Sequence, residues 1–436
     1  MHSQFALLTQ RRFLPFFVTQ ALGAFNDNVY KNVLVILATY HTARYTSMDL
    51  GLLTNLAAGL FILPYLLFSG LAGQLSDKYD KSIILRTVKV CELAIMVVAS
   101  VGLAMHMISI LLLAVFLMGA HSTFFAPAKY GLLPEILAES ELTGGNALLE
   151  MGTFISIVLG ALLAGILATA DQLLLTVSVL MLIAIAGFIA SRAIPVLTPI
   201  DPQLKIDWNV IRATLASLKV TRHEPLVLRA ILAISWFWLF GVVMLTHIPM
   251  LGARVLHGTE GVVTLLLVGF SIGIGLGSLA CERITGRVID LGLVPFGPLG
   301  LSIFSFDLYA ASSTESIMAH MSAIDFVTAR FGLRILFDVL MMGVSGGLYI
   351  VPLYTLMTQK SPARVRSRIV SANSIWNAIF MVIGSLLGAA ALARGYSVPQ
   401  LILGLSVMNC LFAVWLFSKT PQFIKQCYAL CVRARR

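Results

Sequence analysis

The chain has 436 residues, of which 58% are hydrophobic and only 11% are charged. Soluble domains carry about 25% charged residues, so this composition excludes an ordinary soluble protein. The formal net charge is +10, from 30 Lys and Arg against 20 Asp and Glu, which raises the question of nucleic-acid or anionic-lipid binding.

Apolar stretches of about 20 residues, the length that a helix needs to cross a bilayer, recur along the whole chain. We predict twelve transmembrane helices and thus an all-α membrane protein. They cover residues 13–40, 51–75, 83–104, 108–126, 144–169, 172–191, 228–251, 262–281, 293–311, 334–358, 369–391 and 399–418. The stretch 293–311 is the least regular, because Asp307 interrupts it. No cleavable signal is expected, since "MHSQFALLTQRR" lacks an apolar core.

The basic residues are distributed unevenly between the two sides that these helices define. If the N-terminus is inside, 23 of the 30 Lys and Arg residues lie in cytoplasmic segments. This asymmetry is the positive-inside rule, and it predicts that both termini are cytoplasmic. Membrane topology therefore accounts for the excess of Lys and Arg residues, and no nucleic-acid partner is expected. The five cysteines lie in spans or on the cytoplasmic side, so no disulfide is expected.

The chain divides into two six-helix halves, residues 1–191 and 228–418, followed by a basic tail, 419–436. The linker 192–227 begins with prolines and continues with an amphipathic stretch, 207–220, expected on the inner membrane surface. The halves resemble each other between their fourth and fifth helices. The matching positions are Pro127/Tyr130 with Pro352/Tyr354, and Asn146/Glu150 with Asn373/Asn377.

Several polar residues lie at the centre of the first predicted span, where a charge costs a few kcal/mol. Asp27 and Lys31 are four residues apart, so they share a helix face and are expected to pair. The pair either holds helices together or faces a cavity that binds a charged substrate or a coupling ion. Asn26 and Asn28 in the same turn favour the cavity.

Other ionisable residues within spans extend this candidate pathway. They are Lys89 and Glu92 in the third span, Lys129 and Tyr130 at the end of the fourth, Asn146 and Glu150 in the fifth, and Arg334 and Asp338 in the tenth. The pairs Lys89/Glu92 and Arg334/Asp338 have a second interpretation, as local pairs near the interface. Lys129 has one too, as a positive-inside anchor.

Glycine spacing predicts where two helices approach closely. Gly269, Gly273 and Gly277 form two overlapping GxxxG repeats in the eighth span. The same spacing suits static packing and helix movement, so both interpretations stay open.

An enzyme is not expected from the motifs. The spacing of His320 and Asp325 in "HMSAID" matches the HxxxxD pattern of glycerolipid acyltransferases, but a chain of this composition is expected to contain about 0.2 such pairs by chance. The GxxxxGK[ST] phosphate-binding loop is absent from the sequence, so an ATP-driven pump is not expected either. No cofactor or metal is expected.

Two parallel six-helix repeats joined by a cytoplasmic loop resemble the major facilitator transporters. The loop after the second span also resembles the motif of that superfamily, in which a glycine is followed by an acidic and then basic residues. The matching residues are Gly73, Asp77, Lys78 and Lys81, with Arg86 as an expected partner of Asp77. The resemblance implies a latch that holds one conformational state; an ordinary charged loop is the alternative. Asp80 and Ser82 depart from the motif and put its turn geometry in question.

Four blocks are similar to the bacterial lysophospholipid transporter family. They are 21–37 "ALGAFNDNVYKNVLVIL", 124–136 "FFAPAKYGLLPEI", 144–154 "GGNALLEMGTF" and 367–381 "SRIVSANSIWNAIFM". They most resemble the form that is fused to a glycerophospholipid acyltransferase and an acyl-activating domain.

The resemblance implies movement of lysophosphatidylethanolamine across the bacterial inner membrane, for reacylation by a cytoplasmic acyltransferase or acyl-activating enzyme. Lysophospholipid and membrane lipids are then the expected partners, and the chain is expected to be a monomer. Two alternatives remain: a cation-coupled transporter of a small amphiphilic or charged solute on the same fold, and a non-transporting sensor.

Overall fold

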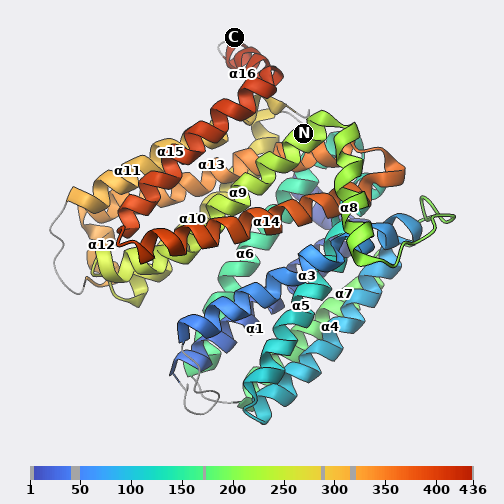
Figure 1. Cartoon of the computed structure of the whole chain (residues 1–436), viewed down its shortest axis with the longest axis horizontal. Coiled ribbons are helices and arrows are strands. Elements are labelled where there is room, and N and C mark those ends of the chain that lie inside the picture. The colour runs from blue at the N-terminus through green and yellow to red at the C-terminus, as the bar shows by residue number, and fades with distance from the viewer. Residues whose placement is uncertain (1–3, 41–49, 170–172, 286–289, 315–320, 435–436) are drawn as a thin grey trace. The chain divides into compact units, whose positions relative to one another are not determined.

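The computed structural model describes residues 4–40, 50–169, 173–285, 290–314 and 321–434 (Figure 1). Twelve long helices occur in these ranges: α1 (Leu14–Tyr40), α3 (Leu50–Lys78), α4 (Lys81–Ala104), α5 (Ile108–Ile136), α6 (Leu142–Thr169), α7 (Leu173–Arg192), α9 (Pro225–Met250), α10 (Glu260–Thr285), α11 (Phe296–Thr314), α13 (Arg330–Lys360), α14 (Arg366–Ala393) and α15 (Val398–Lys419). Each corresponds to one predicted span, which confirms the all-α fold.

Shorter elements connect or follow these helices. They are α8 (Val210–Val220), α12 (Ala323–Thr328), α16 (Pro421–Ala434), the 3-10 turns η1 (Gln4–Thr9), η2 (Glu139–Glu141), η3 (Thr221–His223), η5 (Leu291–Leu293) and η6 (Ala363–Val365), and the π-helical turn η4 (Leu251–Val255). Eleven of the long helices are apolar and long enough to cross a membrane. The twelfth is α1, which carries the polar residues at the centre of the first span.

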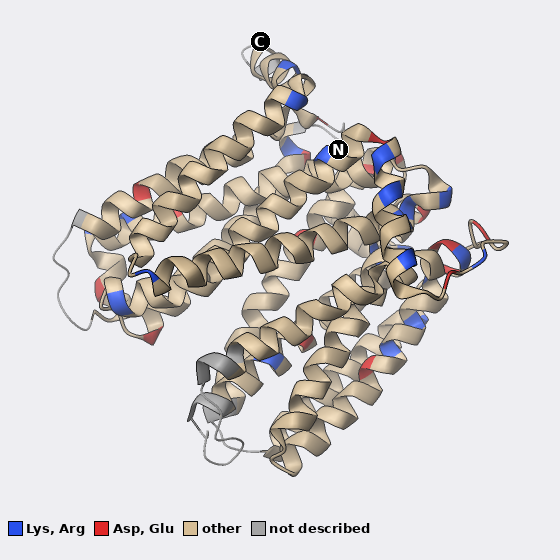
Figure 2. Ribbon diagram, viewed as in Figure 1, with Lys and Arg blue, Asp and Glu red and all other residues tan. Residues whose placement is uncertain are grey.

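Helix ends differ from the predicted ranges where capping or local packing decides them. The fourth span was expected to end at residue 126, but α5 continues to Ile136 through Pro127 and Pro134. The predicted tail 419–436 contains a helix, α16, rather than only a basic extension. Charged residues lie mostly near the helix ends, and the middle of most helices carries few of them (Figure 2).

The amphipathic stretch in the linker forms α8. Asn209 caps it by accepting a hydrogen bond from the backbone N–H of Arg212, at 3.0 Å. Ile211 and Leu215 are 72% and 60% exposed, whereas Ala213 is buried against Gly70 of α3. The helix therefore packs on α3 through small residues and leaves a larger apolar face uncovered.

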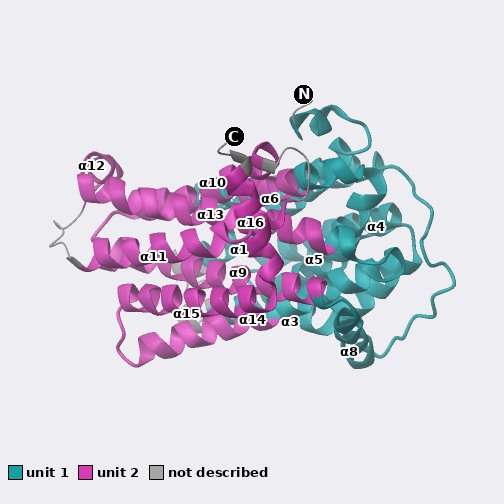
Figure 3. Ribbon diagram, turned by 90° about the horizontal axis from the view of Figure 1, so that it is seen from above, with its two compact units in different colours: residues 1–145, 156–225, 358–378 teal, residues 146–155, 226–357, 379–436 magenta. Residues whose placement is uncertain are grey.

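The chain forms two compact units (Figure 3). The first contains residues 1–145, 156–225 and 358–378, and the second contains residues 146–155, 226–357 and 379–436. The units follow the two sequence halves with two exceptions: a short part of α6 belongs to the second unit, and residues around the start of α14 belong to the first.

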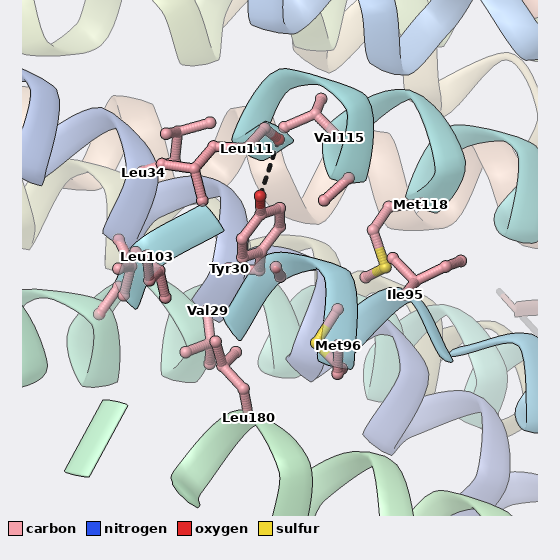
Figure 4. Close-up of a cluster of buried hydrophobic side chains, with 14 of the residues drawn as sticks. Val29, Tyr30, Leu34, Ile95, Met96, Leu103, Leu111, Val115, Met118 and Leu180 are labelled. Atoms are coloured by element: carbon pink, nitrogen blue, oxygen red, sulfur yellow. Dashed lines mark hydrogen bonds between the residues drawn. The ribbon is translucent and has the colours of Figure 1, made fainter. Parts of the chain in front are cut away.

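The core of the first unit lies among α1, α4, α5, α6 and α7 (Figure 4). Tyr30 is fully buried there, and its hydroxyl donates to the backbone carbonyl of Leu111 at 2.8 Å. Val29, Met96 and Leu180 pack in the same cluster. A buried phenol needs such a partner, because an unsatisfied hydroxyl in an apolar core is costly.

In the second unit, α10 and α13 approach closely at the predicted glycines. A Cβ atom added to Gly273 would collide with the carbonyl oxygen of Leu340, and one at Gly277 with that of Val344. The glycine spacing therefore serves backbone contact between these two helices, as the GxxxG pattern predicts. In the same unit, the rings of Trp236 and Phe412 stack with centroids 4.5 Å apart.

Candidate functional site

A buried cluster of polar side chains centres on Glu92 of α4 in the first unit. Lys89 Nζ donates to Glu92 Oε2 at 2.5 Å, and Asn26 Nδ2 of α1 donates to Glu92 Oε1 at 2.9 Å. His121 of α5 brings its Nε2 atom within 3.3 Å of Glu92 Oε2. The side chains of the Lys89–Glu92 pair are completely buried among neighbouring helices. The pair therefore does not extend to the membrane–water interface, which was the second interpretation of the sequence.

Small residues on two helices make room for the Lys89 ammonium. A Cβ atom at Gly23 of α1 would lie 2.8 Å from Lys89 Nζ, and one at Gly187 of α7 would lie 3.1 Å from it. On the other side, Lys89 Nζ lies 5.9 Å from the ring centroid of Phe125, which stacks on His121. The backbone of α1 and α7 therefore admits a long cation that would otherwise not fit between packed helices.

The expected ion pair between Asp27 and Lys31 is not formed. Ser122 of α5 donates to Asp27 Oδ2 at 2.8 Å, whereas Lys31 Nζ lies 4.2 Å from the ring centroid of Phe61 in α3. The i, i+4 spacing brings the two residues onto one face, but neighbouring helices offer each side chain a different partner. Helix spacing alone therefore predicted the wrong contact.

Two hydrogen-bond acceptors in this cluster remain open. Asn26 Oδ1 and Asp27 Oδ1 are buried and have no hydrogen-bond partner among the described residues. Buried polar atoms are nearly always satisfied in folded proteins, so these two open acceptors make the cluster a candidate site. Lys31 lies one turn further along α1 and brings a positive charge to the same part of the unit.

His121 and Ser122 belong to this cluster, although they were not predicted as site residues. Both lie in an otherwise apolar part of α5, and His121 is only 6% exposed. An ionisable residue within a membrane span is itself a signal of function. That signal would have selected His121 from the sequence.

The other predicted residues have contacts of their own. Asn28 donates to the carbonyl of Ala24 in its own helix, at 2.7 Å. Lys129 and Tyr130 are buried next to each other in α5, with the ammonium 4.9 Å from the phenol ring centroid. Asn146 and Glu150 are buried in the part of α6 that belongs to the second unit, where Asn146 Nδ2 donates to Thr355 Oγ1 at 3.2 Å.

Asp77, at the end of α3, binds the first turn of α14. Its carboxylate accepts hydrogen bonds from the backbone N–H of Ser367 and from Arg368 Nε, both at 2.9 Å. Gly73 makes this approach possible, because a Cβ atom there would lie 2.9 Å from the Arg368 Cα atom. A carboxylate at a helix N-terminus also interacts favourably with the helix dipole.

The remaining residues of the loop motif have other partners. Arg86 does not pair with Asp77 as expected; its guanidinium donates to the carbonyls of Ser191 and Ile194, at 3.3 and 2.6 Å. Lys81 pairs with Glu135 at 2.7 Å, and Lys78 lies 5.7 Å from the ring centroid of its neighbour Tyr79.

The substitution of Asp80 for the usual glycine does not disturb the turn. Asp80 has ordinary backbone angles, φ −58° and ψ 125°, so no glycine is needed there. Its carboxylate caps α4 by accepting hydrogen bonds from the N–H and the hydroxyl of Ser82, at 2.8 and 2.9 Å. The two departures from the motif, Asp80 and Ser82, therefore bind each other.

Arg334 has a different partner from Asp338, with which it was expected to pair near the outer end of the tenth span. Arg334 makes a bidentate contact with Asp307 of α11, at 2.9 and 2.5 Å, while Asp338 is buried in α13. Of the HxxxxD spacing, His320 lies outside the described residues. Asp325 forms a capping box with Ser322 at the start of α12, which accounts for its side chain structurally.

Comparison with known proteins defines the class to which this fold belongs. The family model of the Major Facilitator Superfamily matches residues 16–333, and the chain belongs to this family. Solved structures with a similar fold include the human organic anion transporter MFSD10, with a TM-score of 0.71 and 13% identity over 93% of this chain and 99% of that one. The proton:xylose symporter XylE also gives a TM-score of 0.71, at 13% identity, covering 94% of this chain and 95% of the other.

The relatives found by sequence similarity have names that specify a class of substrate. The Lysophospholipid transporter LplT of Escherichia coli O1:K1 is 24% identical over 400 residues, which is 91% of this chain and 92% of the relative. LplT of Klebsiella pneumoniae subsp. pneumoniae is also 24% identical, over 93% of this chain and 94% of its own length. The chain is therefore a multi-pass membrane protein with homology to transporters named for lysophospholipids.

Proposed function

We propose that this chain transports lysophospholipids, lysophosphatidylethanolamine above all, across the bacterial inner membrane by alternating access, and that it is not an enzyme. The observation that carries this proposal is the buried cluster around Asn26 and Asp27. Its two open acceptors suit the ammonium of an ethanolamine headgroup, and Lys31 suits the phosphate. Homology to LplT over more than nine-tenths of both chains supports the lipid.

Each part of a lysolipid then meets a suitable environment. The headgroup charges must be paired while they cross the hydrocarbon, because an unpaired charge there is costly. The single acyl chain needs only an apolar groove or the surrounding lipid, which accords with the few polar residues in the spans. A cytoplasmic acyltransferase or acyl-activating enzyme, either separate from the transporter or fused to it, would restore the second acyl chain of the transported lipid. We propose that the transporter acts as a monomer with both termini in the cytoplasm.

Asp77 and its contacts would stabilise one conformational state during transport. In this proposal the carboxylate holds the first turn of α14 through Ser367 and Arg368, while Gly73 keeps the backbones close. A state in which α14 moves away has to break two hydrogen bonds to a buried carboxylate. The latch acts on the population of states rather than on the headgroup itself.

A second candidate is cation-coupled transport of a small amphiphilic solute. The open oxygen atoms of Asn26 and Asp27 favour it, because the same two acceptors suit a coupling cation instead of a headgroup ammonium. The two candidates differ in where the substrate enters, since a lysolipid arrives from the membrane and a solute arrives from water.

The test uses cells that lack other lysolipid uptake. Labelled lysophosphatidylethanolamine is added to the outer leaflet, and its conversion to diacyl lipid is measured with and without this chain and a cytoplasmic acyltransferase. Conversion that requires both proteins supports the proposal. A lack of conversion, together with uptake of a water-soluble solute, would replace it with the second candidate.

A further inference from the structure

The second unit contains a lateral cavity that is separate from the buried cluster described above. It has a volume of about 560 Å³ and lies among α11, α13 and α15. This is within the range of about 300–1,000 Å³ that is usual for ligand sites. Apolar side chains form most of its lining, including Ile303, Phe337 and Val407, which are 51–54% exposed although they lie within predicted membrane spans.

The polar end of the cavity has an excess of negative charge. Asp307, Arg334 and Asp338 line it, and Arg334 is engaged by both oxygens of Asp307. Asp338 is only 1% exposed, and its Oδ2 atom has no hydrogen-bond partner among the residues that the structure describes. Asp338 lies close enough to Asp307 to interact with it, while the bidentate contact of Arg334 is made with Asp307. A second cation would complete the site.

The other polar lining residues, Ser302, Ser406 and Cys410, have hydrogen-bond partners among themselves and with the neighbouring Asn409. Asn409 Nδ2 donates to Ser302 Oγ at 2.8 Å, Ser406 Oγ donates to the Ser302 carbonyl at 2.9 Å, and Cys410 Sγ donates to Ser302 Oγ at 3.2 Å. These satisfied groups can therefore bind a polar ligand only weakly, whereas the apolar side chains around them suit a hydrocarbon chain. Among the described residues, Asp338 Oδ2 is the polar side-chain atom of the lining without a partner, so the cavity combines one open acceptor with a mainly apolar lining.

From this arrangement we infer that the cavity binds a diacyl membrane phospholipid with a primary ammonium headgroup. The ammonium donates to Asp338, the half-exposed Arg334 lies beside the phosphate, and one acyl chain follows α11 past Ile303 towards Leu299. A metal ion fits less well, because the described residues contain no group of three or more His, Cys, Asp or Glu side chains that could hold one. The cavity opens on the membrane-facing surface, where bilayer lipids are the abundant source of this chemistry.

The binding test uses the purified, delipidated full chain. Phosphatidylethanolamine, phosphatidylcholine and phosphatidylglycerol are titrated separately, and bound lipid is counted by native mass spectrometry. A photoactivatable phosphatidylethanolamine then identifies the helices it contacts. We expect binding in the order ethanolamine, choline, glycerol, because choline has a charge without N–H donors and glycerol has neither. Cross-links should fall on α11, α13 and α15.

Two pairs of variants locate the site. Asp338→Asn should weaken phosphatidylethanolamine binding about tenfold, as expected for the loss of one charged contact, and Asp338→Glu should retain most of it. Val407→Trp fills the cavity and should block binding. Leu411→Trp is the matched control, since Leu411 is 66% exposed on the same helix, one turn away, and does not line the cavity.

Three results would overturn the inference. Equal binding of phosphatidylglycerol and phosphatidylethanolamine would remove the role of the ammonium. Unchanged binding in both Asp338→Asn and Val407→Trp would place the lipid elsewhere. Preferential binding of lysophosphatidylethanolamine, lost in Asp338→Asn, would make the cavity part of the substrate path instead of a site for a bilayer lipid. None of these results depends on the transport activity proposed above.

Discussion

Arg368 Nε donates to Asp77 Oδ2 at 2.9 Å, although 291 residues separate the two along the chain. The contact joins the end of α3 to the first turn of α14 within the first compact unit. Asp77 is completely buried, so its carboxylate depends on this guanidinium and on the Ser367 N–H for compensation.

Replacing Asp77 by Asn should change the population of conformational states without changing the intrinsic affinity for substrate. The amide keeps the shape but loses the charge-assisted bond to Arg368, so the state that contains this contact becomes less favourable. Single cysteines placed on both membrane faces would report the shift as altered labelling. Arg86→Gln is the control, because Arg86 bonds to backbone carbonyls instead of Asp77, and an equal effect of both variants would contradict the prediction.

Replacing Asp27 by Asn should abolish lysolipid transport and leave the protein folded. Ser122 can still donate to the amide oxygen, and the change removes a buried charge that no ion pair compensates. Transport and thermal unfolding would be measured on the same preparation. Loss of both would show that Asp27 mainly holds helices together, and normal transport would show that it binds neither substrate nor ion.

Replacing Glu92 by Leu should destabilise the protein by about 3–5 kcal/mol, because Lys89 would remain buried without its carboxylate. The double variant Lys89→Met, Glu92→Leu removes both charges and should recover most of this loss. Thermal unfolding in detergent gives the comparison. A double variant no more stable than the single one would argue against the ion pair as the cause.

Replacing Gly273 by Ala should separate α10 from α13 and lower stability, since the added methyl group would collide with the Leu340 carbonyl. Gly404→Ala is the matched control. A Cβ atom at Gly404 in α15 meets nothing within 4 Å, so this change should be neutral, or stabilising by up to about 1 kcal/mol through helix propensity. Equal unfolding temperatures for the two variants would contradict the close contact.

In α16, outside the spans, burial raises the pKa of the Cys427 thiol, and proximity to Cys431 raises it further. A raised pKa means less thiolate at a given pH, so Cys427 should react with iodoacetamide more slowly than an ordinary thiol and only at higher pH. Mass spectrometry of labelled peptides measures the rate. The variant Cys431→Ser should move the pH midpoint of Cys427 down, and an unchanged midpoint would show that Cys431 does not contribute.

The helices of this protein and its all-α class could be predicted from the sequence. Twelve apolar stretches predicted the twelve long helices because span length and hydropathy are local properties, independent of neighbouring helices. The in-span charges Asp27, Lys89 and Glu92 could be selected one by one as candidate site residues for the same reason, since each is unusual in its own apolar stretch of sequence.

The contacts between side chains could not be predicted in the same way, because they depend on how the helices pack. Asp27 binds Ser122 instead of Lys31, Arg334 binds Asp307 instead of Asp338, and Asp77 binds Arg368 instead of Arg86. Every wrong pairing assumed a partner nearby in sequence. The physical reason is that a long or buried side chain is satisfied by whichever complementary group a neighbouring helix brings within reach, and helix packing, unlike helix length, is a property of the whole chain.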